Sequence, residues 1–141
     1  GVTMENAAVE APSGAYKAIA WLGMAWNTLG AGLYLWTKLD PEAAAAGASP
    51  AMQDYMANMP TYAHIGWSLG IWGSFLGSLL MLLGRRQAVP AFLVSLLGAL
   101  ASFGAQMQAG VLDPGMTAFI VAVIALLLWV SRRAVATGYL K

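Results

Sequence analysis

Residues 62–83 read YAHIGWSLGIWGSFLGSLLMLL, and this stretch decides the fold. Its glycines, Gly66, Gly70, Gly73 and Gly77, follow one another at intervals of four, three and four residues. On an α-helix this spacing places them in one stripe along one face. In a soluble helix each glycine costs about 1 kcal/mol relative to alanine, whereas in a membrane a stripe of small residues lets a second helix approach closely. We therefore expect a transmembrane helix whose glycines are helix-packing residues.

The composition of the whole chain indicates the same class of protein. Of its 141 residues, 60% are hydrophobic and 9% are charged, whereas charged residues make up about 25% of an average soluble domain. The net charge is only +1 and no basic run or nucleic-acid motif occurs, so we expect no nucleic-acid partner. The absence of cysteine excludes disulfides, thiolate metal sites and a cysteine nucleophile.

Four apolar runs approach the roughly 20 residues that are needed to cross about 30 Å of hydrocarbon. They cover residues 15–36, 62–83, 89–107 and 114–131. The last is the shortest and could begin at Val111, which would place Pro114 in its first turn. We expect an all-α, integral membrane four-helix bundle over residues 15–135. Residues 1–14 are interpreted as a disordered tail, of which 1–3 precede Met4 and could remain from cloning, and residues 136–141 as a cytoplasmic tail.

The charged residues predict how the bundle is oriented. The basic residues before the first run, between the second and third, and after the fourth are Lys17, Arg85, Arg86, Arg132, Arg133 and Lys141. The other side of a four-span protein carries Asp40, Glu42, Asp54 and Asp113, with Lys38 as its single basic residue. By the positive-inside rule both termini are cytoplasmic. We expect a multi-pass protein of a bacterial inner membrane.

The segment between the first two runs carries a further helical pattern. Met52, Tyr55, Met56 and Met59 are spaced i, i+3, i+4 and i+7, which places them on one apolar face. Ser49 is suited to cap the start of this helix, and Pro60 to end it. We expect a short amphipathic helix that lies on the outer membrane surface or covers the bundle.

Small residues recur along the other runs as well. Gly23 and Gly30 occupy the first run and Gly98 the third, each within a stripe of small residues, and Ala118, Ala122 and Ala125 form a stripe in the fourth. Four such stripes favour a compact bundle with close contacts between helices. We therefore expect little interior volume within one chain, and any pore would form between protomers.

Polar residues inside the runs are the candidate ligand-binding residues, because polar groups are costly in a membrane unless they are paired. No Asp, Glu, Lys or Arg lies deep in any run, which argues against a proton relay or an ion-coupled carrier. The candidates are Asn27, Tyr34, Ser74 and Gln106. The alternative, which is the commoner role of such residues, is a hydrogen bond between helices.

A metal site has weaker support. His64 is the only histidine, and a single histidine cannot supply a zinc site or bis-histidine haem ligation. Met52, Met56 and Met59 accompany it on the outer side, and thioethers suit Cu(I). Methionines at helical spacing are more often packing residues. We favour no metal site and expect no cofactor.

Several motifs resemble a family of small four-span proteins of proteobacterial inner membranes. They are WNTLGA at 26–31, WSLGIWGSFLGSLL at 67–80 and RRQAVPAFLVSLLGA at 85–99. Family members often have a tyrosine before the glutamine late in the third span, where this chain has Ala105 before Gln106. The resemblance implies a four-span fold and an inner-membrane location. Some members carry the label of sugar transporter, which would imply transport.

Three functions remain open after these observations. No nucleophile elbow, paired intramembrane carboxylates or P-loop occurs, so we expect no enzyme. The favoured hypothesis is a membrane protein that acts through helix–helix association, as an oligomer or as an accessory subunit, with lipid and membrane proteins as its partners. The first alternative is a small-solute transporter or channel. The second is a periplasm-facing module that binds copper or an apolar cofactor.

Overall fold

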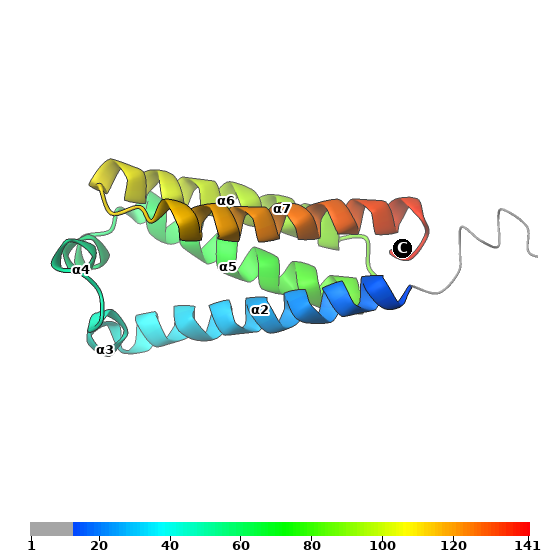
Figure 1. Ribbon diagram of the computed structural model, residues 1–141, viewed down its shortest axis with the longest axis horizontal. Coiled ribbons are helices and arrows are strands. Elements are labelled where there is room, and N and C mark those ends of the chain that lie inside the picture. Colours follow the sequence, from blue (N-terminus) through cyan, green and yellow to red (C-terminus); the bar gives the residue numbers. More distant parts are fainter. Residues whose placement is uncertain (1–12) are drawn as a thin grey trace, which may run out of the picture.

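The computed structural model describes residues 13–141, and this part of the chain is mainly helical and without strands. The expected all-α class is confirmed. The tail predicted for residues 1–14 lies outside the described residues as far as residue 12. The helices are α2 (Gly14–Leu39), α3 (Pro41–Ala45), α4 (Pro50–Ala57), α5 (Thr61–Leu82), α6 (Ala88–Ala109) and α7 (Pro114–Ala136). The four long helices run lengthwise, and the two short ones lie together at one end (Figure 1).

Three of these helices are long and apolar enough to cross a membrane. They are α5, α6 and α7, with mean hydropathies of 1.5, 1.9 and 2.2 over their most apolar stretches. Helix α2 is longer, at 26 residues, but it carries Trp21, Trp26 and Asn27, which lower its mean hydropathy. The protein is therefore a membrane protein by the length and composition of its helices.

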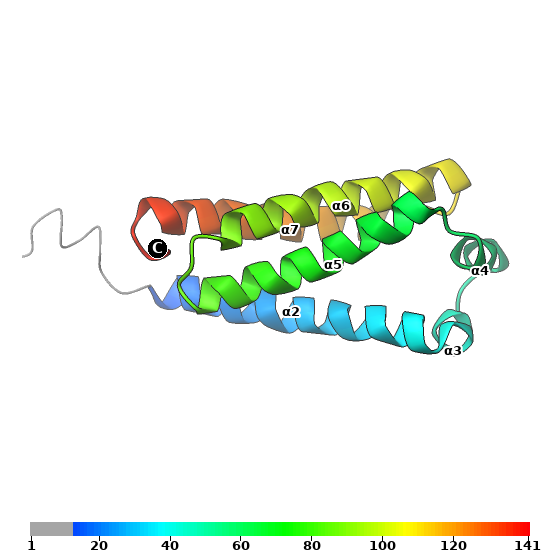
Figure 2. The same ribbon diagram turned by 180° about the vertical axis from the view of Figure 1, so that it is seen from behind.

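Charged residues divide the described bundle into two ends. The basic end carries Lys17, Arg85, Arg86, Arg132, Arg133 and Lys141, at the start of α2, the α5–α6 turn and the end of α7. The acidic end carries Asp40, Glu42, Asp54 and Asp113, together with Lys38. The start of α2 and the chain's C-terminus lie at the same end of the bundle, opposite α3 and α4 (Figures 1 and 2).

Helix α7 starts at the first residue of the predicted run but extends beyond its predicted end at residue 131. It begins at Pro114, because the carboxylate of Asp113 accepts hydrogen bonds from the backbone N–H groups of Gly115 and Met116 at 3.1 and 3.2 Å. Its start is therefore later than Val111. The helix continues to Ala136 and, at 23 residues, exceeds α5 and α6 in length. The charged side chains of Arg132 and Arg133 do not end the helix. The Arg133 guanidinium lies 5.1 Å from the Trp129 ring centre.

A short helix occupies the segment between α2 and α5. The Ser49 hydroxyl accepts from the Met52 N–H at 3.2 Å, and Pro50 takes the first helical position, where its missing N–H is harmless. The helix ends at Ala57, so Met59 lies beyond it. Tyr55 is buried in a small cluster at the acidic end. Its other members are Ala63 and Ala105, with Met52, Met56, Met59 and Val111 packed against them.

Helices α5 and α6 pack with their backbones in contact. A Cβ atom added at Gly66 would lie 2.7 Å from the carbonyl oxygen of Gly98, and one added at Gly98 would lie 2.6 Å from that of Gly66. A Cβ at Gly73 would lie 3.0 Å from the carbonyl oxygen of Ala91. Side chains larger than hydrogen are therefore excluded at these three positions unless the helices separate.

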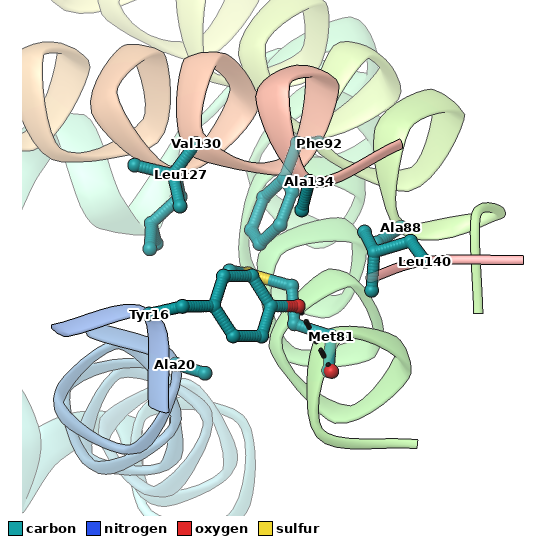
Figure 3. Close-up of a cluster of buried hydrophobic side chains, with 9 residues drawn as sticks. All are labelled: Tyr16, Ala20, Met81, Ala88, Phe92, Leu127, Val130, Ala134 and Leu140. Carbon is teal, nitrogen blue, oxygen red and sulfur yellow. Dashed lines mark hydrogen bonds between the residues drawn. The ribbon is translucent and has the colours of Figure 1, made fainter. Parts of the chain in front are cut away.

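A cluster of apolar side chains closes the basic end, with members from all four long helices (Figure 3). The Tyr16 hydroxyl donates to the carbonyl oxygen of Met81 at 3.0 Å and ties α2 to α5. Leu140 is buried in the same cluster, and the N–H of Lys141 donates to the carbonyl oxygen of Gly84 at 3.0 Å. The segment expected as a tail thus packs onto the α5–α6 turn. The remaining members are Ala20, Ala88, Phe92, Leu127, Val130 and Ala134.

Away from this cluster, α2 diverges from α6 and α7 (Figures 1 and 2). Both views show the separation widening toward the acidic end, while α5 crosses from the side of α2 to the side of α6. The divergence leaves room between the helices in the acidic half of the bundle, and this room holds the candidate site.

Candidate functional site

A cavity of about 520 Å³ lies between α2, α5, α6 and α7, with Met52 of α4 as part of its wall. Its volume falls within the range of small-molecule sites in proteins, about 300–1,000 Å³. The expectation of little interior volume is therefore wrong for the bundle as a whole. It applies to the α5–α6 seam, where the glycine stripe brings two backbones together. The glycine stripe of α5 does not bring α2 and α7 together, and the cavity opens between these two helices.

The glycines of α2 and α5 show why the cavity forms beside Gly30. A Cβ at Gly23 would meet Leu127 Cδ2 at 2.9 Å, and one at Gly77 would meet the Phe92 ring at 2.8 Å, so both occupy tight contacts. A Cβ at Gly70 would lie 3.3 Å from the backbone nitrogen of Ala99. Gly30 is different, because the nearest atom to an added Cβ is Ile71 Cδ1 at 3.5 Å, an ordinary contact distance. Gly30 lines the cavity and lies in no close helix crossing.

Most of the cavity wall is apolar. It is formed by aromatic and aliphatic side chains of all four long helices, among them Trp26, Leu33, Ile71, Phe103, Ile120 and Ile124. The rings of Trp26 and Phe119 meet edge to face with centroids 5.3 Å apart, and they bridge α2 and α7. A wall of this kind fits an apolar molecule with few polar groups.

Asn27 is a buried polar residue of the cavity wall, and it is only 8% exposed. Its side-chain nitrogen donates to the carbonyl oxygen of Ser74 at 3.0 Å and to the hydroxyl of Ser78 at 2.7 Å. The carbonyl of Ser74 can only accept, so the amide nitrogen must face it and the amide orientation is settled. The Asn27 Oδ1 atom has no hydrogen-bond partner among residues 13–141.

Ser74 also lines the cavity, but its polar groups are engaged elsewhere. Its carbonyl accepts from Asn27, and its hydroxyl lies 2.6 Å from that of Ser95. The Ser95 hydroxyl donates its only proton to the carbonyl oxygen of Gly70, so the Ser74 hydroxyl is the donor of the pair. Ser74 therefore joins α2, α5 and α6. This is the interhelical hydrogen bonding that the sequence left open as the alternative to ligand binding.

Two further polar residues face the cavity from one side of α6. Ser102 and Gln106 are four residues apart and both line it. Ser102 is 7% exposed. Neither side chain has a hydrogen-bond partner within the described part of the chain. Sequence reasoning named Gln106 and missed Ser102, although their four-residue spacing places the two on one helix face.

Tyr34 does not line the cavity. Its hydroxyl is hydrogen-bonded to that of Ser68, and its ring centre lies 4.6 Å from that of Trp67 and 5.8 Å from that of Trp72. The ammonium of Lys38 lies 5.6 Å from the centre of the Tyr34 ring. Of the four predicted ligand-binding residues, the cavity thus brings together Asn27, Ser74 and Gln106, and Tyr34 belongs to an aromatic group between α2 and α5.

The predicted metal candidates are divided between two places. Met56, Met59 and His64 line a second hollow of about 580 Å³ at the acidic end, while Met52 lines the first cavity. The Lys38 ammonium lies 2.8 Å from Nδ1 of His64, and because an ammonium only donates, that nitrogen accepts. The positive charge beside the ring opposes a bound cation. Across residues 13–141, no three His, Cys, Asp or Glu residues are grouped to hold a metal ion.

No family model, curated protein or solved structure matches this chain.

Proposed function

We propose that this chain is a four-span, non-enzymatic protein of a bacterial inner membrane that binds a small apolar molecule in the cavity between α2 and α7. One observation carries the proposal: a cavity of about 520 Å³ with an apolar wall, into which a few polar groups without partners project. Convergent polar groups in an apolar cavity are typical of binding sites for small molecules.

Helix α2 is the fourth span in this proposal. Its 26 residues extend over about 39 Å at 1.5 Å per residue, which is enough to cross a bilayer. It carries no charged residue between Lys17 and Lys38. Its large exposed side chains in this interval are apolar: Trp21, Leu22, Leu29, Leu33, Leu35 and Trp36. The basic end is then cytoplasmic and the acidic end external, by the positive-inside rule.

The apolar cluster at the basic end supports binding over free conduction. Tyr16, Phe92 and Leu127 are buried in it, and it lies between the cavity and the basic end. A molecule that enters from the acidic end or from the lipid would reach the middle of the bundle and stop there. This arrangement also suits one state of a transporter, the second candidate, which requires in addition a state that opens at the basic end.

Association of this chain with other membrane helices is a separate proposal. The packing of α5 against α6 weakens the argument for it from the glycine stripe. The glycine stripe of α5 is occupied by α6 of the same chain, so it is not free to receive a partner. Native mass spectrometry in mild detergent would count subunits and reveal a partner protein. A monomer without a partner would contradict the association proposal and leave the cavity proposal intact.

The experiment for the cavity compares two glycine-to-leucine variants on α2. Gly30→Leu places a side chain in the cavity, where only Ile71 lies near an added Cβ. Gly32→Leu makes the same chemical change at an exposed position with nothing within 4 Å. Each protein is extracted in mild detergent, and its bound small molecules are identified by mass spectrometry. We expect an apolar molecule with the wild type and Gly32→Leu, and at least tenfold less of it with Gly30→Leu. Equal amounts in all three would contradict the proposal.

A further inference from the structure

The unpartnered polar side chains that α2 and α6 contribute to the cavity lie at two separate levels. Asn27 is at the level of Ser74 on α5, to which it is hydrogen-bonded. Ser102 is at the level of Gly66, since a Cβ added there would lie 3.1 Å from the Ser102 backbone nitrogen. Gly66 and Ser74 are eight residues apart on one helix, so the two levels are separated by about 12 Å along the bundle at 1.5 Å per residue.

The wall of α2, α5 and α6 between these levels is mainly apolar. It includes Gly30, Gly70, Ile71 and Ala99. Polar ends with an apolar middle are the complement of an elongated molecule that carries a polar group at each end. A molecule with a single polar head would leave one level unpaired, and an unpaired buried polar group weakens binding.

The chemistry of the deeper level restricts the polar group further. Asn27 has used both of its N–H groups, and its remaining atom, Oδ1, can only accept. A ligand group at this level must therefore donate, as a hydroxyl does and an ether or ester does not. At the other level, Ser102 can donate or accept, and Gln106 one turn further can do both.

From this arrangement we propose that the cavity takes a two-headed neutral amphiphile, an elongated apolar molecule with a hydroxyl at one end and a second hydrogen-bonding group at the other. The hydroxyl donates to Oδ1 of Asn27, and the second group pairs with Ser102 or Gln106. This inference rests on the proposed function, because it specifies the ligand of the same cavity.

The test uses terminal alkanediols as probes, each in competition with the alkanol of equal length. The full chain is placed in lipid nanodiscs with an equimolar mixture of the two, and the bound species are counted by native mass spectrometry. Octanediol, dodecanediol and hexadecanediol sample the separation of the two levels. We expect one length to be preferred, with that diol bound about tenfold more than its alkanol. The less polar alkanol is enriched in the bilayer, so this bias works against the expected result.

Side-chain variants then locate the preference. Asn27→Leu and the double variant Ser102→Ala/Gln106→Leu should each bring the diol-to-alkanol ratio close to one. Thr28→Val should leave the ratio unchanged, because the Thr28 hydroxyl donates to Met24 of its own helix and is exposed. A diol and an alkanol bound equally by the wild type would overturn the two-headed ligand and leave cavity binding standing. Binding of neither probe, together with equal small-molecule content in the Gly30→Leu protein, would overturn both proposals.

Discussion

At the scale of single residues, Asn27 combines structure with recognition. Its amide nitrogen joins α2 to α5 through Ser74 and Ser78, and this leaves the amide oxygen facing the cavity. Because the nitrogen is held by two acceptors, the oxygen is presented in one orientation before any ligand arrives. A preorganised acceptor loses less entropy on binding than a freely rotating one.

The contribution of the Asn27 hydrogen bonds to the stability of the fold can be measured. Asn27→Leu should destabilise the protein by about 1–2 kcal/mol, because two interhelical hydrogen bonds in a membrane are lost. Thermal unfolding in detergent, followed by tryptophan fluorescence, measures the change. Thr28→Val is the control, since the neighbouring hydroxyl bonds only within its own helix. An unchanged melting temperature for Asn27→Leu would mean that these bonds do not hold α2 in place.

Tyr55 differs from Asn27 in that its buried polar group forms no interhelical hydrogen bond in the described part of the chain. Its hydroxyl is buried and has no hydrogen-bond partner within residues 13–141. Burial, and to a smaller extent the neighbouring Tyr62, raises the pKa of Tyr55 above its ordinary value. The folded state therefore favours the protonated phenol. At neutral pH the phenol is protonated in both the folded and the unfolded state, so the shift leaves stability unchanged there. As the pH rises past about 10, the unfolded tyrosine ionises first and the folded state loses stability.

Tyr55→Phe should leave the stability unchanged, or raise it by a few tenths of a kcal/mol, because it removes a buried group that has no partner to lose. The difference in melting temperature between wild type and variant, followed from pH 8 to pH 11, checks both statements. The wild type should lose stability faster in the alkaline range. A variant that is clearly less stable at pH 8 would reveal a hydrogen bond of the Tyr55 hydroxyl.

At the scale of elements, the α5–α6 seam is the most closely packed part of the molecule. Gly66 and Gly98 let the two backbones touch, and the Ser74–Ser95–Gly70 chain of hydrogen bonds crosses the same seam. Both features reduce the freedom of these helices relative to each other. The cavity is built on this pair as its fixed wall, with α2 and α7 on the side where the packing is looser.

A matched pair of alanine substitutions on α6 tests the seam. Gly98→Ala should cost about 1–3 kcal/mol, because its Cβ would lie 2.6 Å from the carbonyl oxygen of Gly66. Gly104→Ala should be neutral or stabilise by up to about 1 kcal/mol, since nothing lies within 4 Å of its Cβ and alanine favours the helix. Unfolding in denaturant measures both. Equal effects of the two substitutions would contradict a seam of touching backbones.

The elements also show what a sequence can predict. Spacing and caps locate local structure well: the glycine stripe indicates a close helix crossing, and Ser49 does start a helix. The end of α7 was missed, because the Arg132–Arg133 pair ends an apolar run without ending the helix. Tyr34 lies outside the cavity and packs against α5. Whether its face of α2 meets the cavity or α5 depends on how the helices diverge.

At the scale of the whole molecule, the cavity itself was beyond sequence reasoning. The stripes indicate which helix faces can pack closely, but they do not tell how far α2 and α7 diverge. These two helices contact each other mainly through the cluster at the basic end. The divergence that opens the cavity is set by the relative tilt of whole helices. Tilt follows from the sum of many contacts, and no single motif encodes it.

The orientation of the molecule decides from which side the cavity is reached, and the absence of cysteine makes it simple to test. Gly47 lies in the loop at the acidic end and Gln87 in the turn at the basic end, and both are exposed. In intact cells whose outer membrane has been made permeable, Gly47→Cys should react with a membrane-impermeant maleimide. Gln87→Cys should react only after the inner membrane is opened. Since the cavity is closed by apolar packing at the basic end, this result would make its ligand one that arrives from the periplasm or the lipid. The reverse labelling pattern would turn the cavity toward the cytoplasm and contradict the positive-inside assignment.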